Sequence, residues 1–256
     1  MIFSQNCHFC KNITKYSLKY CRFCELKREK ENVIIYIETF GKFFHKKTKK
    51  SEDEKMISDK ALKAAQDAYD IEEACIREMK DYFDKDSFSQ AVELLSTATR
   101  IGASGCGHSG IACQHFAHLM CCIERPAKFI SPAEAVHGGT GYLQAGDVML
   151  FASRGGSTKE LFPIADICKA KGVKIITITE NLSSPLAQLA DVTIKQHVNR
   201  ETDKYNMQGT TSTTALCMLF HALQTAVIEE TDYKSEQFAL IHPGGAVGER
   251  LNKKSL

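Results

Sequence analysis

Three short segments combine glycine with hydroxyl side chains in a pattern that suits an anion. They are GCGHSG (residues 105–110), SRGGSTKE (residues 153–160) and QGTTSTT (residues 208–214). Each is expected where a strand meets a helix or a helix begins, so that backbone N–H groups and the helix dipole favour a negative charge. One such loop is often only a turn with a helix cap. Three of them along one sheet predict a pocket for a ligand that carries phosphate.

The first segment also spells G-x-G-x-x-G, which is the fingerprint of a dinucleotide site. The acidic residue that such a site needs about twenty positions further on would be Glu134. Glu134 lies in PAEAVHGG, a loop with its own histidine and not a typical ribose-binding strand end. A redox enzyme would also not need two further hydroxyl-rich loops. We therefore favour a sugar phosphate as the ligand, and a dinucleotide oxidoreductase stays a competing hypothesis.

Two carboxylates and two histidines in the polar segments suit general acid–base catalysis of a carbonyl shift. They are Glu160 on the first turn of a helix, His137 in EAVHGG, Glu201 in NRETDKYNMQG and His242 at the start of HPGGAVGERL. Ordinary structural roles are open to them as well. Glu160 would be a helix-start acid, Glu201 a solvated loop acid, and His242 would pack against Pro243. None of these residues has the spacing of a metal-ligand pair.

The first 55 residues differ in character from the remainder. Residues 1–50 hold 12 Lys and Arg against 4 Asp and Glu, although the whole chain has a formal net charge of only +2. Two C-x-x-C pairs separated by ten residues suit tetrahedral Zn²⁺ and consist of Cys7, Cys10, Cys21 and Cys24. A knuckle with a structural zinc ion is one interpretation of residues 1–55, and a disordered extension or a start assigned upstream of Met56 are the others. The basic excess lacks a nucleic-acid-binding motif, so no nucleic acid partner is expected.

After residue 56 the hydrophobic periodicity predicts the elements that must position the chemistry. Apolar spacing of three and four residues predicts helices at 57–83, 86–98, 108–124, 158–172, 185–190 and 210–230. Short apolar runs predict strands at 99–105, 126–131, 146–154, 173–180 and 191–197. Strands that are apolar on both faces are typical of a parallel sheet covered by helices on both sides. The ligand crevice of such a fold lies at the carboxyl ends of the strands, where the three loops fall.

Composition and local signals add further expectations. No run of about eighteen apolar residues occurs and the N-terminus lacks the pattern of a secretory signal, so the chain is expected in the cytoplasm without a membrane span. The cysteines beyond the N-terminal extension are scattered through apolar helices, which predicts reduced, buried thiols. At the helix ends, Asp86 or Ser87 is expected as an N-cap and Gly172 as a C′ glycine.

Five motifs in a fixed order carry a family resemblance: GCGHSG, SPAEAVHGGTGYL, GDVMLFASRGGSTKEL, DVTIKQHVNRETDKYNMQGTTSTTA and FALIHPGGAVGERL. This order resembles the sugar isomerase (SIS) domain, most of all its arabinose-5-phosphate isomerase branch, from Met56 to Leu251. The resemblance implies a SIS domain at residues 56–256, with an α/β/α sandwich around a five-stranded parallel sheet. It also implies interconversion of an aldose and a ketose phosphate through a cis-enediol, without a metal ion or another cofactor for catalysis.

The resemblance also implies roles for single residues. The catalytic carboxylates of the family match Glu160 and Glu201, its catalytic histidine matches His242, and its loop histidine matches His137. The residues expected to contact the sugar phosphate are His108, Ser109, Ser153, Arg154, Gly156, Ser157, Thr158, Thr211 and Ser212. The family often uses the HPGG histidine to complete a neighbour's site, which implies a homodimer or homotetramer in which His242 serves a second subunit.

Three departures from the family pattern bear on the substrate. His108 stands where the isomerases carry lysine, and a neutral imidazole does not replace a permanent ammonium group. Arg154 opens RGGST where the family has NSGES, so the loop loses an acid and gains a guanidinium. The chain also ends soon after HPGG, so the paired nucleotide-sensing modules that often follow this domain are not expected. A non-catalytic phosphosugar sensor is therefore the alternative hypothesis.

Overall fold

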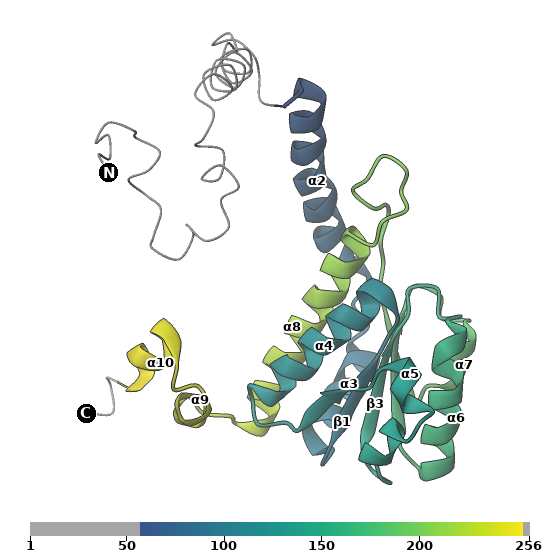
Figure 1. Cartoon of the computed structure of the whole chain (residues 1–256), viewed down its shortest axis with the longest axis vertical. Coiled ribbons are helices and arrows are strands. Elements are labelled where there is room, and N and C mark those ends of the chain that lie inside the picture. Colours follow the sequence, from purple (N-terminus) through teal and green to yellow (C-terminus); the bar gives the residue numbers. More distant parts are fainter. Residues whose placement is uncertain (1–56, 253–256) are drawn as a thin grey trace, which may run out of the picture. The chain divides into compact units, whose positions relative to one another are not determined.

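The computed structural model describes residues 57–252, in which helices and strands alternate (Figure 1). The strands are β1 (Ile101–Ser104), β2 (Ala127–Phe129), β3 (Val148–Ala152), β4 (Lys174–Thr179) and β5 (Val192–Lys195). The α-helices are α2 (Asp59–Glu78), α3 (Lys85–Thr97), α4 (Gly107–Cys121), α5 (Pro132–Ala135), α6 (Phe162–Lys171), α7 (Pro185–Leu189), α8 (Thr211–Thr231), α9 (Ser235–Ile241) and α10 (Gly245–Asn252). Short 3₁₀ helices are η4 (Met79–Tyr82), η5 (Gly139–Tyr142) and η6 (Lys159–Leu161).

The strands of the described residues form one parallel sheet with the order β2-β1-β3-β4-β5. This confirms the predicted five-stranded parallel sheet. The chain leaves β1 toward β2 on one side and returns to β3 on the other, so the strand order reverses between β1 and β3. In open α/β sheets, ligands bind outside the carboxyl ends of the strands at such a reversal.

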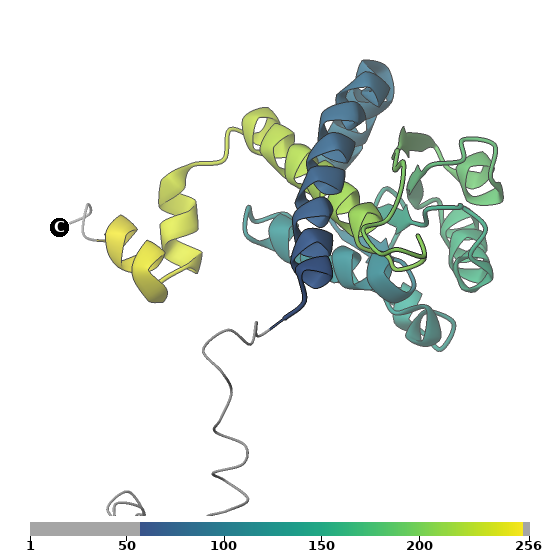
Figure 2. The same cartoon turned by 90° about the horizontal axis from the view of Figure 1, so that it is seen from above.

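Helices cover both faces of the sheet and bury two separate apolar layers. One layer lies under α3, α4 and α8 and includes Val148, Leu150 and Ala152 of β3. The other lies under α6 and α7 and includes Met149 and Phe151 of the same strand. Figures 1 and 2 show α6 and α7 on one side of the sheet and α4 and α8 on the other. Because successive side chains of a strand point to opposite faces, a doubly covered strand needs an unbroken apolar run.

The two predicted helix ends have different outcomes. The N-cap of α3 is Asp84, whose carboxylate accepts hydrogen bonds from the backbone N–H groups of Asp86 and Ser87. The expectation that Asp86 or Ser87 is the cap is therefore wrong, because the helix begins at Lys85 and both residues already lie in its first turn. Gly172 ends α6 with a φ of 71°, which confirms the expected C′ glycine.

Of the described helices, α8 is the one whose length and hydropathy would allow it to cross a membrane. A long core helix meets the same criteria, so this property is weak evidence for a membrane span. In the structure α8 contacts α3 and α4 and buries Leu216, Phe220 and Leu223 in the core. The burial of these side chains is what a core helix requires.

The cysteines within residues 57–252 are free. Cys75, Cys113 and Cys168 are buried as expected, whereas Cys121 is exposed on the last turn of α4. The proposed zinc ligands lie outside the described residues, so the zinc knuckle stays a prediction; they are Cys7, Cys10, Cys21 and Cys24.

A buried carboxylate fixes the amino-terminal edge of the sheet. Asp147, directly before β3, is only 2% exposed. It accepts hydrogen bonds from the backbone N–H of Arg100 at 3.0 Å, from Nε of Arg100 at 2.9 Å and from the backbone N–H of Gln144 at 2.8 Å. These donors offset the cost of taking the charge out of water. Asp147 therefore ties the start of β3 to the residue that precedes β1.

Replacing Asp147 with alanine should lower the free energy of unfolding by about 2–4 kcal/mol, because its donors would lose their acceptor inside the fold. Chemical denaturation followed by circular dichroism measures the change. Asp67→Ala is the matched control, since Asp67 pairs with Lys63 on the surface of α2, and it should cost less than about 1 kcal/mol. Equal losses in the two variants would contradict the role given to Asp147.

Candidate active site

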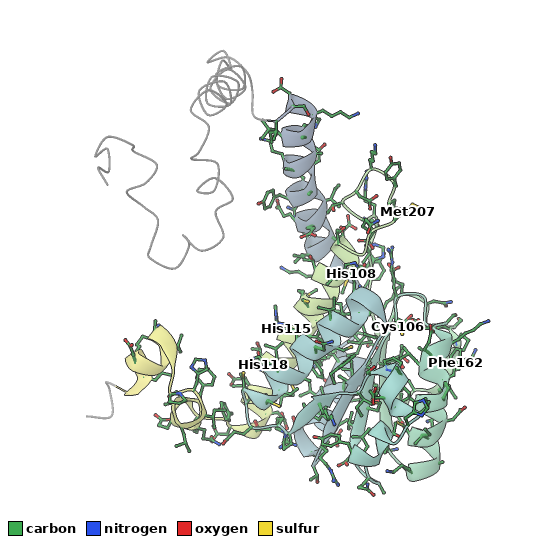
Figure 3. All side chains as sticks on the ribbon, in the orientation of Figure 1. Cys106, His108, His115, His118, Phe162 and Met207 are labelled. Atoms are coloured by element: carbon green, nitrogen blue, oxygen red, sulfur yellow. The ribbon has the colours of Figure 1, made fainter. Side chains whose placement is uncertain are left out.

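The three glycine- and hydroxyl-rich loops lie at the carboxyl edge of the sheet. Residues 105–110 connect β1 to α4, residues 153–160 follow β3, and residues 208–214 lead into α8. The first and third loops touch, because a Cβ atom built on Gly209 would lie 3.1 Å from Cδ2 of His108. In Figure 3, His108 lies at the start of α4, and the loop that carries Met207 lies beyond it. These two loops therefore form one continuous wall.

Backbone conformation and close packing together account for the glycines of GCGHSG. Gly107 has a φ of 56°, a left-handed conformation that glycine adopts without strain. A Cβ on Gly110 would lie 2.6 Å from the carbonyl oxygen of Gly105, so glycine lets α4 begin against the end of β1. His108 is exposed and Ser109 is half-buried at this helix start, where the dipole of α4 favours an anion.

The second loop is held in one shape by its own hydroxyl groups. The hydroxyl oxygens of Ser153 and Thr158 are 2.8 Å apart, and Oγ of Ser153 also accepts a hydrogen bond from the backbone N–H of Gly156 at 3.1 Å. Gly156 has a φ of 65°, and a Cβ there would lie 1.9 Å from Oγ of Ser184, which excludes other residues. The hydroxyl of Ser157 is exposed and has only a long contact of 3.4 Å within the loop. It is therefore available to a ligand.

Glu201 is the most firmly held of the predicted catalytic residues. It is 2% exposed, and its Oε2 accepts the backbone N–H groups of Thr210 and Ser212 at 2.9 and 3.1 Å at the start of α8. Its Oε1 accepts Nη1 of Arg154 at 2.6 Å. Burial alone would raise the pKa of this carboxyl group, but the hydrogen bonds from Ser212 and Thr210 and the charge of Arg154 outweigh it and hold the pKa below its usual value. Glu201 is thus a buried, ionised carboxylate, and the interpretation as a solvated loop acid is wrong.

Glu160 has the opposite environment. It is exposed on η6, and no hydrogen bond or ion pair joins it to another residue of the described range. Burial and then the charge of Glu160 raise the pKa of the Cys106 thiol, so this carboxylate lies near enough to the first loop to act on it electrostatically. The short helix α5 packs against η6, and His137 follows α5 at an exposed position of the same sheet edge.

The guanidinium of Arg154 is already engaged by other residues, whereas an arginine that binds a phosphate would keep its donors available. Its Nε donates to Oε2 of Glu180 at 2.5 Å, its Nη1 to Oε1 of Glu201, and its Nη2 to the carbonyl oxygen of Val198 at 3.3 Å. The guanidinium predicted to contact substrate is therefore engaged by two carboxylates. No sequence pattern singles out Glu180, although its position directly after β4 places it at the same edge as the loops.

The hydroxyl groups of the third loop differ in exposure. Thr210 lies half-buried, and its Oγ1 is 3.2 Å from Oε2 of Glu201 and accepts the backbone N–H of Thr202 at 3.0 Å. Thr211 is 1% exposed, and its buried Oγ1 has no hydrogen-bond partner among the described residues. Ser212 is half-buried. The predicted residue Ser212 bonds to Glu201 through its backbone N–H and its side chain. The sequence pattern did not single out Thr210, which bonds to Glu201 as well, because a run of four threonines around one serine gives no register.

His242 lies at the far end of α8 from these loops. It ends α9, where its ring stacks on Phe238 with the ring centroids 4.9 Å apart. The third loop leads into the start of α8, and the 21 residues of this helix span about 30 Å. Figures 1 and 2 both show α9 and α10 beyond the C-terminal end of α8. His242 therefore lies far from the three loops of its own chain.

A parallel sheet with glycine- and hydroxyl-rich loops at its carboxyl edge is typical of α/β proteins that bind phosphorylated ligands. A family model for the SIS domain matches residues 94–226, just over half of the chain. The chain belongs to the SIS domain family.

Named relatives come from bacteria. Arabinose 5-phosphate isomerase KdsD of Pseudomonas aeruginosa is 38% identical over 167 residues, which cover 65% of this chain and 51% of that protein. Arabinose 5-phosphate isomerase KpsF of Escherichia coli is 32% identical over 179 residues, which cover 70% and 55% respectively. The chain thus spans about half the length of these curated relatives.

Solved structures share the fold. A Listeria monocytogenes protein named as a sugar-phosphate isomerase is 35% identical with a TM-score of 0.71. The match covers 74% of this chain and 100% of that protein. An E. coli CFT073 protein solved in complex with a sugar phosphate is 24% identical with a TM-score of 0.69, covering 73% of this chain and 100% of that one. At that identity the second likeness supports the fold alone.

The lowered pKa of Glu201 predicts a contribution to stability that depends on pH. The fold favours the ionised form, so the contribution is present above the unfolded-state pKa of about 4.3 and is lost as the pH falls through the lower folded-state value. Glu201→Gln should therefore lower the melting temperature most at neutral pH, and the gap from wild type should narrow below about pH 4. Thermal unfolding across the acidic and neutral range measures this gap.

Glu160→Gln is the matched control, because it makes the same chemical change at an exposed carboxylate. It should alter the melting temperature little at any pH. A gap for Glu201→Gln that stays constant from neutral to acidic pH would show that Glu201 is not the buried anion described above.

Proposed function

We propose that this chain is a phosphosugar isomerase that interconverts an aldose phosphate and a ketose phosphate, in the manner for which its arabinose 5-phosphate isomerase relatives are named. The observation that carries the proposal is a pair of unlike carboxylates at one sheet edge, the buried Glu201 and the exposed Glu160. An enediol route needs one group to move a carbon-bound proton and others to exchange hydroxyl protons. The proposal includes no metal ion or cofactor in the reaction, a cytoplasmic location, and neither nucleic acid nor membrane as a partner.

In the proposed reaction a carboxylate removes the proton from C2 of the open-chain aldose while the C1 carbonyl oxygen gains a proton. The electrons of the C2–H bond form the C1=C2 bond of a cis-enediol. The base then returns its proton to C1, and the hydroxyl proton on O2 leaves as C2 becomes the carbonyl carbon. No external oxidant is needed, because one carbon is oxidised as its neighbour is reduced.

We assign the carbon-bound proton to Glu201, because its carboxylate is ionised and its direction is fixed by hydrogen bonds. Glu160 and His137 suit the exchange of hydroxyl protons and ring opening, because both are exposed and can reach a mobile substrate. We assign the phosphate group to the second loop, where the exposed Ser157 and the adjacent Thr158 present hydroxyl groups. The sugar hydroxyls would then meet His108 and the third loop.

We assign His242 to the pocket of a second subunit. Its position beyond the end of α8 is too far from its own pocket for it to act there. The helices around it also expose apolar side chains, with Leu240 78% and Val247 39% exposed, which an oligomer would cover. A dimer or tetramer would in this way complete each site with a histidine from a neighbour.

A sensor that binds a phosphosugar without turning it over is the second candidate, and His108 favours it. This side chain is exposed at the start of α4, where the isomerase pattern has lysine. A neutral imidazole gives no permanent positive charge to hold a phosphate or a sugar oxyanion. In a sensor the ligand would bind and stabilise the fold, and the carboxylates would have no proton to move.

Incubation with a panel of pentose and hexose phosphates in D₂O should place deuterium at C2 of at least one aldose product, because the enediol exchanges its carbon-bound proton with the base. Mass spectrometry and NMR detect the label. Glu160→Gln should keep its thermal stabilisation by that sugar phosphate and lose about 10²–10⁴ in turnover. Stabilisation without exchange would favour the sensor, and stabilisation by NADPH alone would favour the oxidoreductase.

Mixing two inactive variants should restore activity if His242 serves a neighbour. His242→Ala and Glu160→Gln should each be nearly inactive alone. After dissociation and reassociation in equal amounts, mixed dimers would contain one intact site, so that about one quarter of the wild-type activity should return. Two equal portions of His242→Ala mixed with each other are the control. Failure to recover activity in subunits shown to have exchanged would reject the shared site.

A further inference from the structure

Arg154 and Glu180 form a charged bridge between the ends of β3 and β4. Nε of Arg154 donates to Oε2 of Glu180 at 2.5 Å, and Oε1 of Glu180 accepts the backbone N–H of Val198 at 2.6 Å. The backbone adds another tie, because the N–H of Glu180 donates to the carbonyl oxygen of Arg154 at 2.9 Å. Nη2 of Arg154 donates to the carbonyl oxygen of Val198 and Nη1 to Oε1 of Glu201, so the guanidinium is held by three partners.

The two carboxylate oxygens of Glu201 have unequal numbers of partners. Oε2 lies within hydrogen-bond distance of the backbone N–H groups of Thr210 and Ser212 and of the Thr210 hydroxyl, at 2.9, 3.1 and 3.2 Å. Oε1 lies within hydrogen-bond distance of Nη1 of Arg154 at 2.6 Å, and the side chain of Ser212 also interacts with this carboxylate and lowers its pKa. Each carboxylate oxygen offers about two lone pairs. Oε1 is therefore the oxygen that keeps one available, and Arg154 sets the direction of that lone pair.

We propose that Arg154 is a positioning residue: with Glu180 as its counter-ion, its guanidinium orients Oε1 of Glu201 as the oxygen that takes the carbon-bound proton of the substrate and returns it. This inference rests on the proposed function, because it names the atom that would carry out the proton transfer assigned to Glu201. It gives Arg154 a task other than the substrate contact that the sequence pattern predicts.

Glu180 allows Arg154 to contact the proposed base, Glu201, without greatly lowering its basicity. A guanidinium beside a carboxylate favours the ionised form and so makes proton uptake harder. A second carboxylate on the same guanidinium shares that charge, so that Glu201 stays more basic than in a simple ion pair. Arg154 is 37% exposed, and water screens part of its charge as well. The pair Arg154–Glu180 thereby combines fixed orientation with a moderated effect on basicity.

Among the described residues, the other charged and titratable groups around Glu201 do not pair with its carboxylate as Arg154 does, so we attribute its basicity to Arg154 and Glu180. Arg200 lies in the same loop, and its Nε donates to the backbone carbonyl oxygen of Glu201 at 3.1 Å. The thiol of Cys75 in α2 donates to the carbonyl oxygen of His197 at 3.4 Å, and burial, followed by the charges of Glu78, Glu180 and Glu201, raises its pKa to about 11. This thiol stays neutral while the carboxylates titrate. His108 contacts Gly209 of the third loop.

Two substitutions should move the pH–rate profile in opposite directions. Arg154→Met removes the positive charge and should raise the acid-side midpoint of kcat/KM, whereas Glu180→Gln leaves the arginine charge unshared and should lower it. Each shift should be about 0.5–1.5 pH units. Arg154→Lys keeps the charge without the planar fork, so it should keep the midpoint within a few tenths of a unit and lower kcat. A structural role alone would reduce rates without opposite shifts, and that result would overturn the proposal.

Lys174→Met is the matched control. Lys174 pairs with Asp191 at 3.0 Å at the start of β4, the opposite end of the strand from Glu180. Its loss removes one positive charge from an exposed ion pair and should leave the profile of the wild type unchanged. If Lys174→Met shifted the acid-side midpoint as much as Arg154→Met does, the loss of any positive charge would explain the effect, and the proposal would be overturned.

A carbon-13 titration separates this inference from the proposed function. With the carboxyl carbon of glutamate labelled, the Glu201 signal can be assigned by its loss in Glu201→Gln and followed in each variant. The titration midpoint of the Glu201 signal is expected to rise in Arg154→Met and to fall in Glu180→Gln, in parallel with the kinetic shifts. If both variants moved the Glu201 titration midpoint in the same direction while the wild-type enzyme was active, the role of Arg154 would be overturned and the proposed function would stand. A wild-type chain that exchanges no proton with any sugar phosphate would overturn the proposed function, and with it the task given to Oε1.

Discussion

The carboxyl edge of the sheet depends on one buried carboxylate, that of Glu201. The first N–H groups of a helix have no partner within the helix, and α8 begins without a hydrogen bond from the side chain of its own N-cap residue. Glu201 supplies the acceptor from the preceding loop and reaches back to Arg154 at the end of β3. A single charged group therefore fixes where the longest core helix starts relative to the strands.

The apolar layers below that edge explain why it can be so polar. Both faces of β3 are covered, so the strand is buried from Val148 to Ala152 and gives the loop after it a rigid base. The apolar run ends at Ala152, and hydroxyl groups make the hydrogen bonds that shape the loop after it. Gly156 completes this arrangement because its close approach to Ser184 leaves no room for a side chain. The shape of the second loop thus depends on the end of β3 and on Ser184 at the start of α7.

Elements and loops could be predicted from the sequence because they follow from local rules. An unbroken apolar run such as VMLFA predicts a covered strand, and Gly172 predicts the end of a helix. Side-chain partners follow from no such rule. Arg154 belongs to a phosphate-loop motif and yet bonds to Glu180, 26 positions further on, which depends on the pairing of β3 with β4. The distance of His242 from the pocket likewise depends on the path of α8, which the HPGG motif does not encode.

The separation of the two ends of α8 has a consequence for how activity would depend on concentration. A chain that cannot bring His242 to its own Glu201 would, under the proposed function, be complete as a fold and incomplete as a catalyst. Dilution below the dissociation constant of the oligomer would then abolish catalytic activity, although each subunit would stay folded. Specific activity would rise with chain concentration and reach a plateau, so that the supply of protein would itself act as a threshold for the reaction.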